Sequence, residues 1–163
     1  MLRLFVAALL LMLLGCATAA PPSAVRPNIY VMRHLHTPAG ATDPGLTTEG
    51  QLHARRLADR LATDTPAAIY VSATRRAQQT AAPLAARLAI TPKVYNPADT
   101  PGLVAAVLAE VGTVLVIGHS NTVPDIVERL GGPRPAALRH EDFGDLWHLS
   151  GPDRVTRRIK LGE

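Results

Sequence analysis

Short apolar runs alternate with segments of helical periodicity from residue 28 onward, and this alternation constrains the fold more than any other feature. The run at residues 113–117 (TVLVI) is continuous and β-branched, as strands buried in parallel sheets are. Strands alternating with helices favour parallel strands joined by crossover helices. We therefore predict an α/β fold with three α/β/α layers and a mostly parallel central sheet. Further strands are expected at residues 28–32, 68–71, 92–95, 145–149 and 155–161.

Local signals refine this outline. Thr48 and Gln51 fit a capping box that would start the first helix, whose apolar positions extend to Leu61. Pro83 should kink the second helix, whose apolar face runs from Ala77 to Leu88. The last two strands, joined through residues 150–153 (SGPD), are expected to form a C-terminal hairpin at the edge of the sheet.

The first 15 residues (MLRLFVAALLLMLLG) predict a signal peptide. One basic residue, Arg3, precedes an apolar run that is shorter than the ~20 residues of a membrane span. The run closes on residues 13–16 (LLGC), which resemble the bacterial lipobox, so Cys16 is the expected lipidation site and new N-terminus. An A-x-A cleavage site at residues 17–19 is the alternative. Residues 16–27 then form a lipidated N-terminus and tether, and residues 28–163 form the folded domain. We expect an extracytoplasmic protein that faces the periplasm from a lipid anchor, or else a secreted one.

Composition limits the other classes of function. The 163 residues suit one domain, and 17 Lys+Arg against 13 Asp+Glu give a net charge of only +4. Nucleic-acid binding therefore has little support. The single cysteine excludes an internal disulfide and any site built from several cysteines. The oligomeric state is not indicated.

Polar residues follow three of the predicted strands, where ligands bind in open α/β sheets. They are residues 33–37 (RHLHT), 72–76 (SATRR) and 118–121 (GHSN). Arginine offers forked donors to phosphate oxygens, and helix N-termini add oriented amides. An unprotonated imidazole among these cations can attack phosphorus. The sequence thus predicts a phosphate site with two histidines and at least one arginine pair.

These segments resemble the signatures of the histidine phosphatase (phosphoglycerate mutase-like) superfamily. Residues 31–37 are similar to its R-H-G-x-[ST] motif, residues 46–50 to L-T-x-x-G, residues 72–81 to S-x-x-x-R-A-x-Q-T-A, and residues 118–121 to its second-histidine motif. The resemblance covers about residues 28–130 and implies a small single-domain phosphatase that uses neither metal nor cofactor. The roles that it implies are nucleophile for His34, phosphate clamps for Arg33 and Arg76, second pocket histidine for His119, and lesser contacts for Thr37 and Asn121.

The chain departs from this pattern in two ways. Leu35 replaces the glycine, which predicts a bulkier pocket floor, and His36 replaces a frequent glutamate. No acidic residue clearly fits the proton donor of many members. Asp99 lies in roughly the right stretch, and Asp125 lies one turn late. Three acidic residues before Trp147 are weaker candidates for the donor, namely Glu141, Asp142 and Asp145.

The remaining polar residues have simpler interpretations. His53, His140 and His148 are interpreted as structural or surface histidines, and Arg75 as a solvated helix residue. Arg154, Arg157, Arg158 and Lys160 form a basic edge strand, which discourages pairing with another strand. Trp147 and Leu149 are predicted core residues.

The sequence thus predicts an extracytoplasmic phosphatase that hydrolyses a phosphomonoester, or less favourably a phosphoramidate, through phospho-His34. Its substrate would be a phosphorylated small molecule or an envelope phosphoester. Three alternatives stay open: a serine hydrolase using Ser120 in a G-x-S elbow, a metal hydrolase using His34 and His36, and a phosphate-binding pseudophosphatase lipoprotein.

Overall fold

One mixed sheet runs through the computed structural model, which describes residues 26–40 and 42–161, and within that part it has six strands. The first four in spatial order lie parallel, β1 pairs antiparallel with β5, and β5 pairs antiparallel with β6. The sheet is mostly parallel with a C-terminal edge hairpin, which confirms the predicted class. The strands, in spatial order, are β3 (Lys93–Tyr95), β2 (Ala68–Ser72), β4 (Val114–Gly118), β1 (Ile29–Arg33), β5 (Asp145–Ser150) and β6 (Val155–Lys160).

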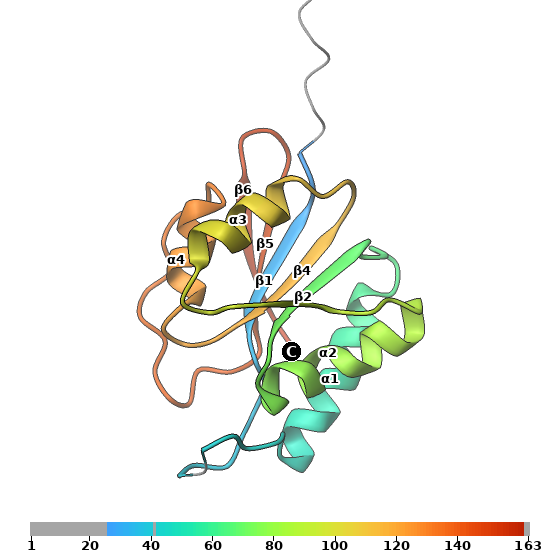
Figure 1. The fold of residues 1–163 in the computed structure, drawn as a ribbon, viewed down its shortest axis with the longest axis vertical. Coiled ribbons are helices and arrows are strands. Elements are labelled where there is room, and N and C mark those ends of the chain that lie inside the picture. Colours follow the sequence, from blue (N-terminus) through green and yellow to red (C-terminus); the bar gives the residue numbers. More distant parts are fainter. Residues whose placement is uncertain (1–25, 41, 162–163) are drawn as a thin grey trace, which may run out of the picture.

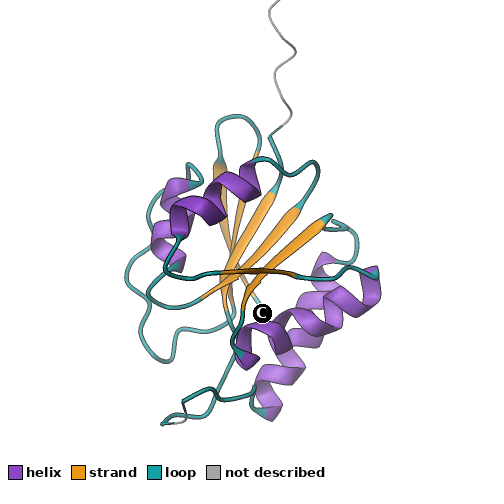
Figure 2. Ribbon diagram, viewed as in Figure 1, coloured by secondary structure: helices purple, strands orange, loops and turns teal. Residues whose placement is uncertain are grey.

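Two helices cover each face of this sheet (Figures 1 and 2). On one side lie α1 (Thr48–Leu61) and α2 (Arg75–Leu88), and on the other lie α3 (Thr100–Leu108) and α4 (Val123–Arg129). Successive side chains of β1 alternate between the two resulting cores: Tyr30 and Met32 pack against α1 and α2, whereas Ile29 and Val31 pack on the side of α3 and α4. Strands buried on both faces must be apolar throughout, which explains the continuous apolar runs.

The start of α1 differs from the prediction by one residue. Thr47, not Thr48, is the N-cap: its hydroxyl accepts from the backbone N–H of Gly50 at 3.1 Å, and its carbonyl accepts from that of Gln51. The extended backbone of Thr47 (φ −66°, ψ 170°) brings that hydroxyl over the first turn. The Thr48–Gln51 capping box was therefore the wrong pairing.

The second helix runs through Pro83, where the sequence predicts a kink, and continues to Leu88. It ends where Ala89 adopts a left-handed conformation with φ 53°, and the N–H groups of Ala89 and Ile90 bond back to the last turn. The helix thus stops at a defined cap and not at its proline.

One of the candidate proton donors, Asp145, is paired within the C-terminal hairpin instead. Asp145 is buried at the start of β5 and accepts from Arg158 at 2.9 and 2.7 Å and from Lys160 at 3.2 Å. Two residues of the basic edge strand therefore neutralise a buried carboxylate within the sheet. Trp147 and Leu149, also on β5, are core residues as predicted.

Residues 1–25 fall outside the described part, so the predicted signal peptide, the Cys16 lipidation site and most of the tether are not addressed by this structure. The described chain begins at Arg26, and the carbonyl of Pro27 accepts from the buried Arg154 side chain at 2.7 Å. None of the described helices combines the length and apolar character that crossing a bilayer requires.

Candidate active site

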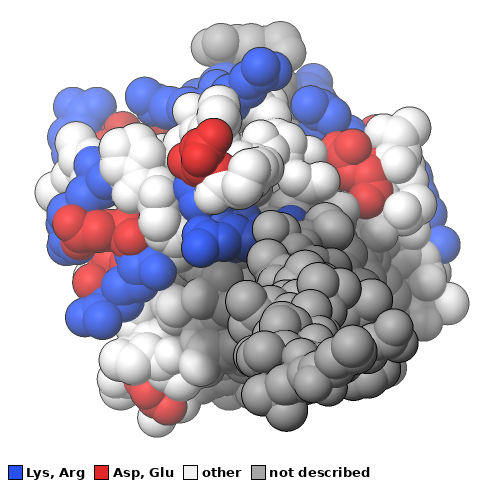
Figure 3. Space-filling view, turned by 90° about the horizontal axis from the view of Figure 1, so that it is seen from above, with Lys and Arg blue, Asp and Glu red and all other residues white. Residues whose placement is uncertain are grey.

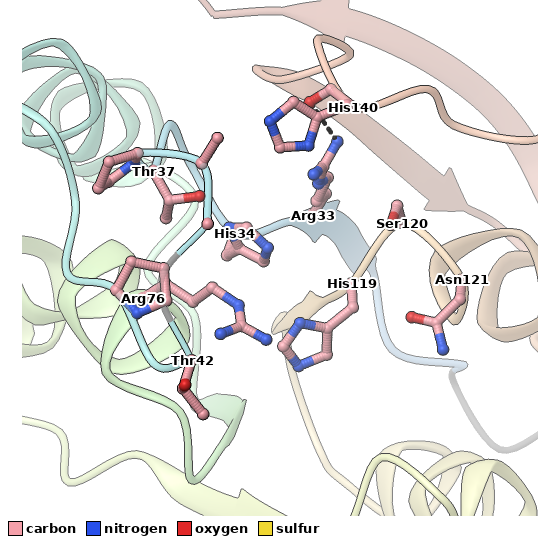
Figure 4. A pocket seen from close by; sticks show the side chains of 13 residues that line it. Arg33, His34, Thr37, Thr42, Arg76, His119, Ser120, Asn121 and His140 are labelled. Carbon is pink, nitrogen blue, oxygen red and sulfur yellow. Dashed lines mark hydrogen bonds between the residues drawn. The ribbon is translucent and has the colours of Figure 1, made fainter.

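A cavity of about 310 Å³ lies at the carboxyl ends of the parallel strands. Its lining includes Arg33 and His34 from the end of β1, Arg76 from the first turn of α2, and His119 directly after β4. Figure 4 shows the side chains of Arg76 and His119 on either side of a space in front of His34. The rest of the lining is Thr37, Pro38, Ala39, Gly40, Thr42, Pro44, Ser120, Asn121 and His140.

Strand pairing sets the two histidines side by side. Arg33 on β1 lies opposite Gly118 on β4, and the N–H of His34 donates to the carbonyl of Gly118 at 2.9 Å. The imidazole rings of His34 and His119 are consequently 5.4 Å apart between centroids and tilted by 60°. Histidines that are 85 positions apart in the sequence meet because their strands are neighbours in the sheet.

A hydrogen bond fixes the tautomer of His34. Its Nδ1 lies 2.9 Å from the carbonyl oxygen of Leu35, and because a carbonyl only accepts, Nδ1 carries the hydrogen. Burial lowers the pKa of His34 to about 3, the Leu35 bond opposes this shift, and the positive charge of Arg33 adds to it. Nε2 of His34 therefore keeps its lone pair at neutral pH, as a nucleophile requires.

The second histidine is held from two directions. Nε2 of His119 lies 2.9 Å from the Ser72 hydroxyl at the end of β2, and the His119 backbone N–H donates to Thr122 Oγ1 at 2.9 Å. Burial lowers the pKa of His119 to about 4, and the charges of Arg76 and Arg33 act in the same direction. The site thus contains two neutral imidazoles beside two guanidinium groups.

An acidic residue holds Arg76 from outside the cavity lining. Asp43 Oδ1 lies 3.6 Å from Arg76 Nη1, and the same carboxylate accepts from the backbone N–H of Arg75 at 3.1 Å. Thr74, the N-cap of α2, makes no capping bond with its own side chain, so Asp43 supplies the acceptor at this helix end. Asp43 thereby fixes both the helix start and the guanidinium of Arg76.

The other arginine is fixed by the loop that precedes β5. Nη1 of Arg33 donates to the carbonyls of Arg139, His140 and Asp142 at 2.8, 3.1 and 3.3 Å. Its guanidinium carbon also lies 4.1 Å from the centroid of the Phe143 ring, a cation–π contact. Burial is the main cause that lowers the pKa of Arg33. The orientation of this clamp therefore depends on residues more than 100 positions away.

Most of the site residues predicted from the sequence line this cavity. It brings together all six residues to which the resemblance gave a role, since Thr37 and Asn121 also line it. Arg75 is exposed beside Arg76, as expected of a solvated helix residue.

The candidate proton donors lie elsewhere. Asp99 is exposed and caps α3, where it accepts from the N–H of Gly102 at 2.9 Å, and Asp125 pairs with Arg129 at 2.8 Å. Asp142 binds Arg139 and does not line the cavity, nor does Glu141. No carboxylate lines the cavity within the part of the chain that the structure describes.

The departures at positions 35 and 36 do not change the cavity floor. Leu35 is fully buried against α1 and α2, because side chains alternate along an extended backbone, so the predicted bulkier floor is wrong. Nε2 of His36 lies 3.5 Å from a carboxylate oxygen of Glu49, and its ring meets the His53 ring edge-on at 5.0 Å and the tilted Phe143 ring at 4.5 Å between centroids. The side chains of His34 and His36 thus lie in different environments. No group of three potential metal ligands occurs among the described residues.

His140 is the histidine of the lining that the sequence did not predict, because it was interpreted as a structural or surface residue. It is exposed and follows no strand: its loop, residues 131–144, reaches the cavity through packing on β1. The only local signal is a polar run at residues 139–142 (RHED) directly before a strand.

Comparison with known proteins agrees with this geometry. A family model described as histidine phosphatase superfamily (branch 1) matches residues 29–97, and no curated protein matches the chain. A putative phosphohistidine phosphatase SixA from Agrobacterium tumefaciens is similar over 84% of this chain and 98% of its own, with 25% identity and a TM-score of 0.64.

Two further structures share the fold. A protein histidine phosphatase SixA complexed with tungstate has 21% identity, covers 81% of this chain and 94% of its own, and has a TM-score of 0.62. A mycobacterial glucosyl-3-phosphoglycerate phosphatase complexed with VO3 has 19% identity, covers 82% and 98%, and has a TM-score of 0.64.

Proposed function

We propose that the chain is a phosphatase of the histidine phosphatase superfamily, one that forms and hydrolyses a phosphohistidine on His34; the family model over residues 29–97 and the similarity to a putative phosphohistidine phosphatase support this. The observation that carries the proposal is the bond from Nδ1 of His34 to the Leu35 carbonyl, which leaves the Nε2 lone pair free beside Arg76 and His119.

The first step joins Nε2 of His34 to phosphorus while the bond to the leaving group breaks. Charge on the equatorial oxygens is stabilised by the guanidinium groups of Arg33 and Arg76, which are held in place before substrate arrives. In the second step a water attacks phosphorus, the N–P bond breaks, and phosphate leaves. Two displacements replace one difficult hydrolysis.

The substrate class is a phosphomonoester, or less favourably a phosphoramidate. A small cavity lined by two arginines and three histidines suits a phosphoryl dianion and little of the group attached to it. Similarity to the putative phosphohistidine phosphatase supports the second class, because a nitrogen leaving group on imidazole needs less help from an acid.

We further propose that the domain is extracytoplasmic and tethered to a membrane by a lipid on Cys16. The signal-like residues 1–15 and the lipobox-like residues 13–16 support this. In Figure 1 the described chain enters at one end of β1, and His34 follows the other end, so the tether would join the domain at the end of β1 opposite the cavity. Figure 3 looks onto the entry end, where basic side chains lie among acidic ones. A precursor band that shifts with globomycin and incorporates an acyl label is expected; no shift and no label would contradict the anchor.

Turnover tests the phosphatase directly. The purified chain should hydrolyse p-nitrophenyl phosphate in the presence of EDTA, vanadate should inhibit it, and His34→Gln should be inactive. Binding of phosphate without turnover of p-nitrophenyl phosphate or a phosphoramidate would identify a pseudophosphatase instead. Loss of activity in EDTA would favour a metal hydrolase, and labelling of Ser120 by a phosphonofluoridate would favour a serine hydrolase.

A further inference from the structure

Among the described residues, three histidines line the cavity, and two of them already have tasks. His34 uses Nε2 as the proposed nucleophile, and Nε2 of His119 is bonded to Ser72. The third is His140, which lies beside the Arg33 guanidinium in Figure 4, with His34 below them in the same cavity. An alkoxide leaving group needs a proton, and a positioned acid typically contributes about 10²–10⁴-fold to such a step.

We infer that His140 is the catalytic acid that protonates the leaving group, an inference that rests on the proposed phosphatase activity. In-line displacement places the leaving group on the side of phosphorus opposite Nε2 of His34. His34 is only 5% exposed, whereas His140 is exposed at the rim of the same cavity. The leaving group therefore points from the buried nucleophile toward the side of the cavity on which His140 lies.

The structure holds His140 in place without using its ring nitrogens. Its backbone carbonyl accepts from Nη1 of Arg33 at 3.1 Å, and its ring meets the Phe143 ring edge-on, with centroids 6.3 Å apart. The centroid of the Phe143 ring is also 5.9 Å from that of the His34 ring, so the same aromatic side chain contacts both the nucleophile and the proposed acid. Among the described residues, no hydrogen bond to the His140 ring is formed, so its N–H groups stay available to a substrate.

The proton balance closes over the two steps. As the N–P bond forms at His34, the P–O bond to the leaving group breaks and the imidazolium of His140 gives its proton to the departing oxygen. The neutral imidazole then removes a proton from the water that attacks phosphohistidine. His140 returns to its starting form, and the products are an alcohol and phosphate.

The test compares two leaving groups in one full-length protein. p-Nitrophenolate is a stable anion that needs no proton, whereas the alkoxide of glycerol does. We expect His140→Gln to lose about 10²-fold or more in kcat/KM on glycerol 1-phosphate and less than about fivefold on p-nitrophenyl phosphate. Arg33 binds the backbone carbonyl of residue 140, so this substitution leaves that contact intact.

Glu141→Gln is the matched control, since its neighbouring carboxylate lies outside the cavity lining and pairs with Arg139. It should leave both reactions within about twofold. Equal losses on both substrates in His140→Gln, no loss at all, or a selective loss in Glu141→Gln would each overturn the inference. So would a wild-type protein that cleaves phosphoramidates but not glycerol phosphate. Failure of the wild type on every substrate would instead refute the proposed function.

Discussion

The cavity has two walls of different origin. The strand-end wall consists of His34, Arg76 and His119, each within a few residues of the end of a parallel strand. The loop wall consists of His140, which lines the cavity, with Arg139, Asp142 and Phe143 behind it; these residues hold Arg33 through three backbone carbonyls and an aromatic ring. The first wall is built from local geometry and the second from long-range packing. The chemistry proposed for them divides in the same way: phosphoryl transfer on the strand-end wall and protonation of the leaving group on the loop wall.

Removing a charge from the strand-end wall should have the largest effect on activity. Arg76→Ala takes away a donor aimed at the transferring phosphoryl group, and kcat/KM for p-nitrophenyl phosphate should fall by about 10²–10³-fold. Arg76→Lys should recover only part of this, since an ammonium group lacks the fork. Arg75→Ala, one residue earlier and exposed, is the control and should stay near wild type. Equal losses in both alanine variants would point to damage to α2.

Burial of His34 in the strand-end wall should make the free energy of unfolding depend on pH. The pKa of His34 is lowered to about 3 in the folded protein, whereas an unfolded histidine titrates near 6.5. The unfolded state therefore binds more protons below pH 6.5, and stability falls as pH falls toward the folded pKa. Between pH 7 and pH 4.5 this one group should cost about 2–3 kcal/mol.

Urea unfolding at these two pH values measures that cost. His34→Gln removes the titrating group, so its stability should decline less than that of the wild type over the same interval. Identical declines in the two proteins would show that His34 is not buried in its neutral form.

The loop wall should act on phosphate affinity through Arg33. Phe143→Leu removes the ring that lies 4.1 Å from the guanidinium, a contact worth about 0.5–2 kcal/mol, which is up to about thirtyfold in Kd. Calorimetric titration with vanadate should show this weakening, and Phe143→Tyr, which keeps a ring, should show little of it. Unchanged affinity in Phe143→Leu would mean that the three carbonyls hold Arg33 by themselves.

The smallest effect is expected at Asp43, which supports the strand-end wall from behind. Asp43→Ala removes the acceptor at the start of α2 and should lower the free energy of unfolding by about 0.5–1 kcal/mol. It should also raise KM several-fold, because Arg76 loses its partner. Asp59→Ala, which breaks an exposed pair with Arg87, is the control for a surface ion pair. A KM that does not change would show that Arg76 needs no partner to be positioned.

The same division explains what the sequence predicts. The continuous apolar runs of the strands and the motifs after them are local signals, so the α/β layers and the convergence of His34, Arg76 and His119 follow from them. The orientation of Leu35 also follows from strand alternation, although its size suggested a change in the cavity floor.

The loop wall has no comparable signal. His140 is positioned by a hydrogen bond from Arg33 to its backbone carbonyl, and a backbone carbonyl does not depend on the residue type. Phe143 matters because it contacts Arg33 in the folded protein, which the sequence does not show. Asp99 shows the converse: a carboxylate in a suitable stretch of sequence is used as a helix cap. Asp43 was overlooked because its partner Arg76 lies 33 positions further along the chain.

The central claim is a covalent phosphohistidine on His34, and intact-mass spectrometry tests it most directly. The purified protein and His34→Ala are mixed briefly with p-nitrophenyl phosphate and quenched without acid, which would hydrolyse the N–P bond, while released nitrophenol is followed in parallel. The account predicts a mass increase of one phosphoryl group together with turnover, both absent in His34→Ala. An adduct or full turnover that persists in His34→Ala would contradict it.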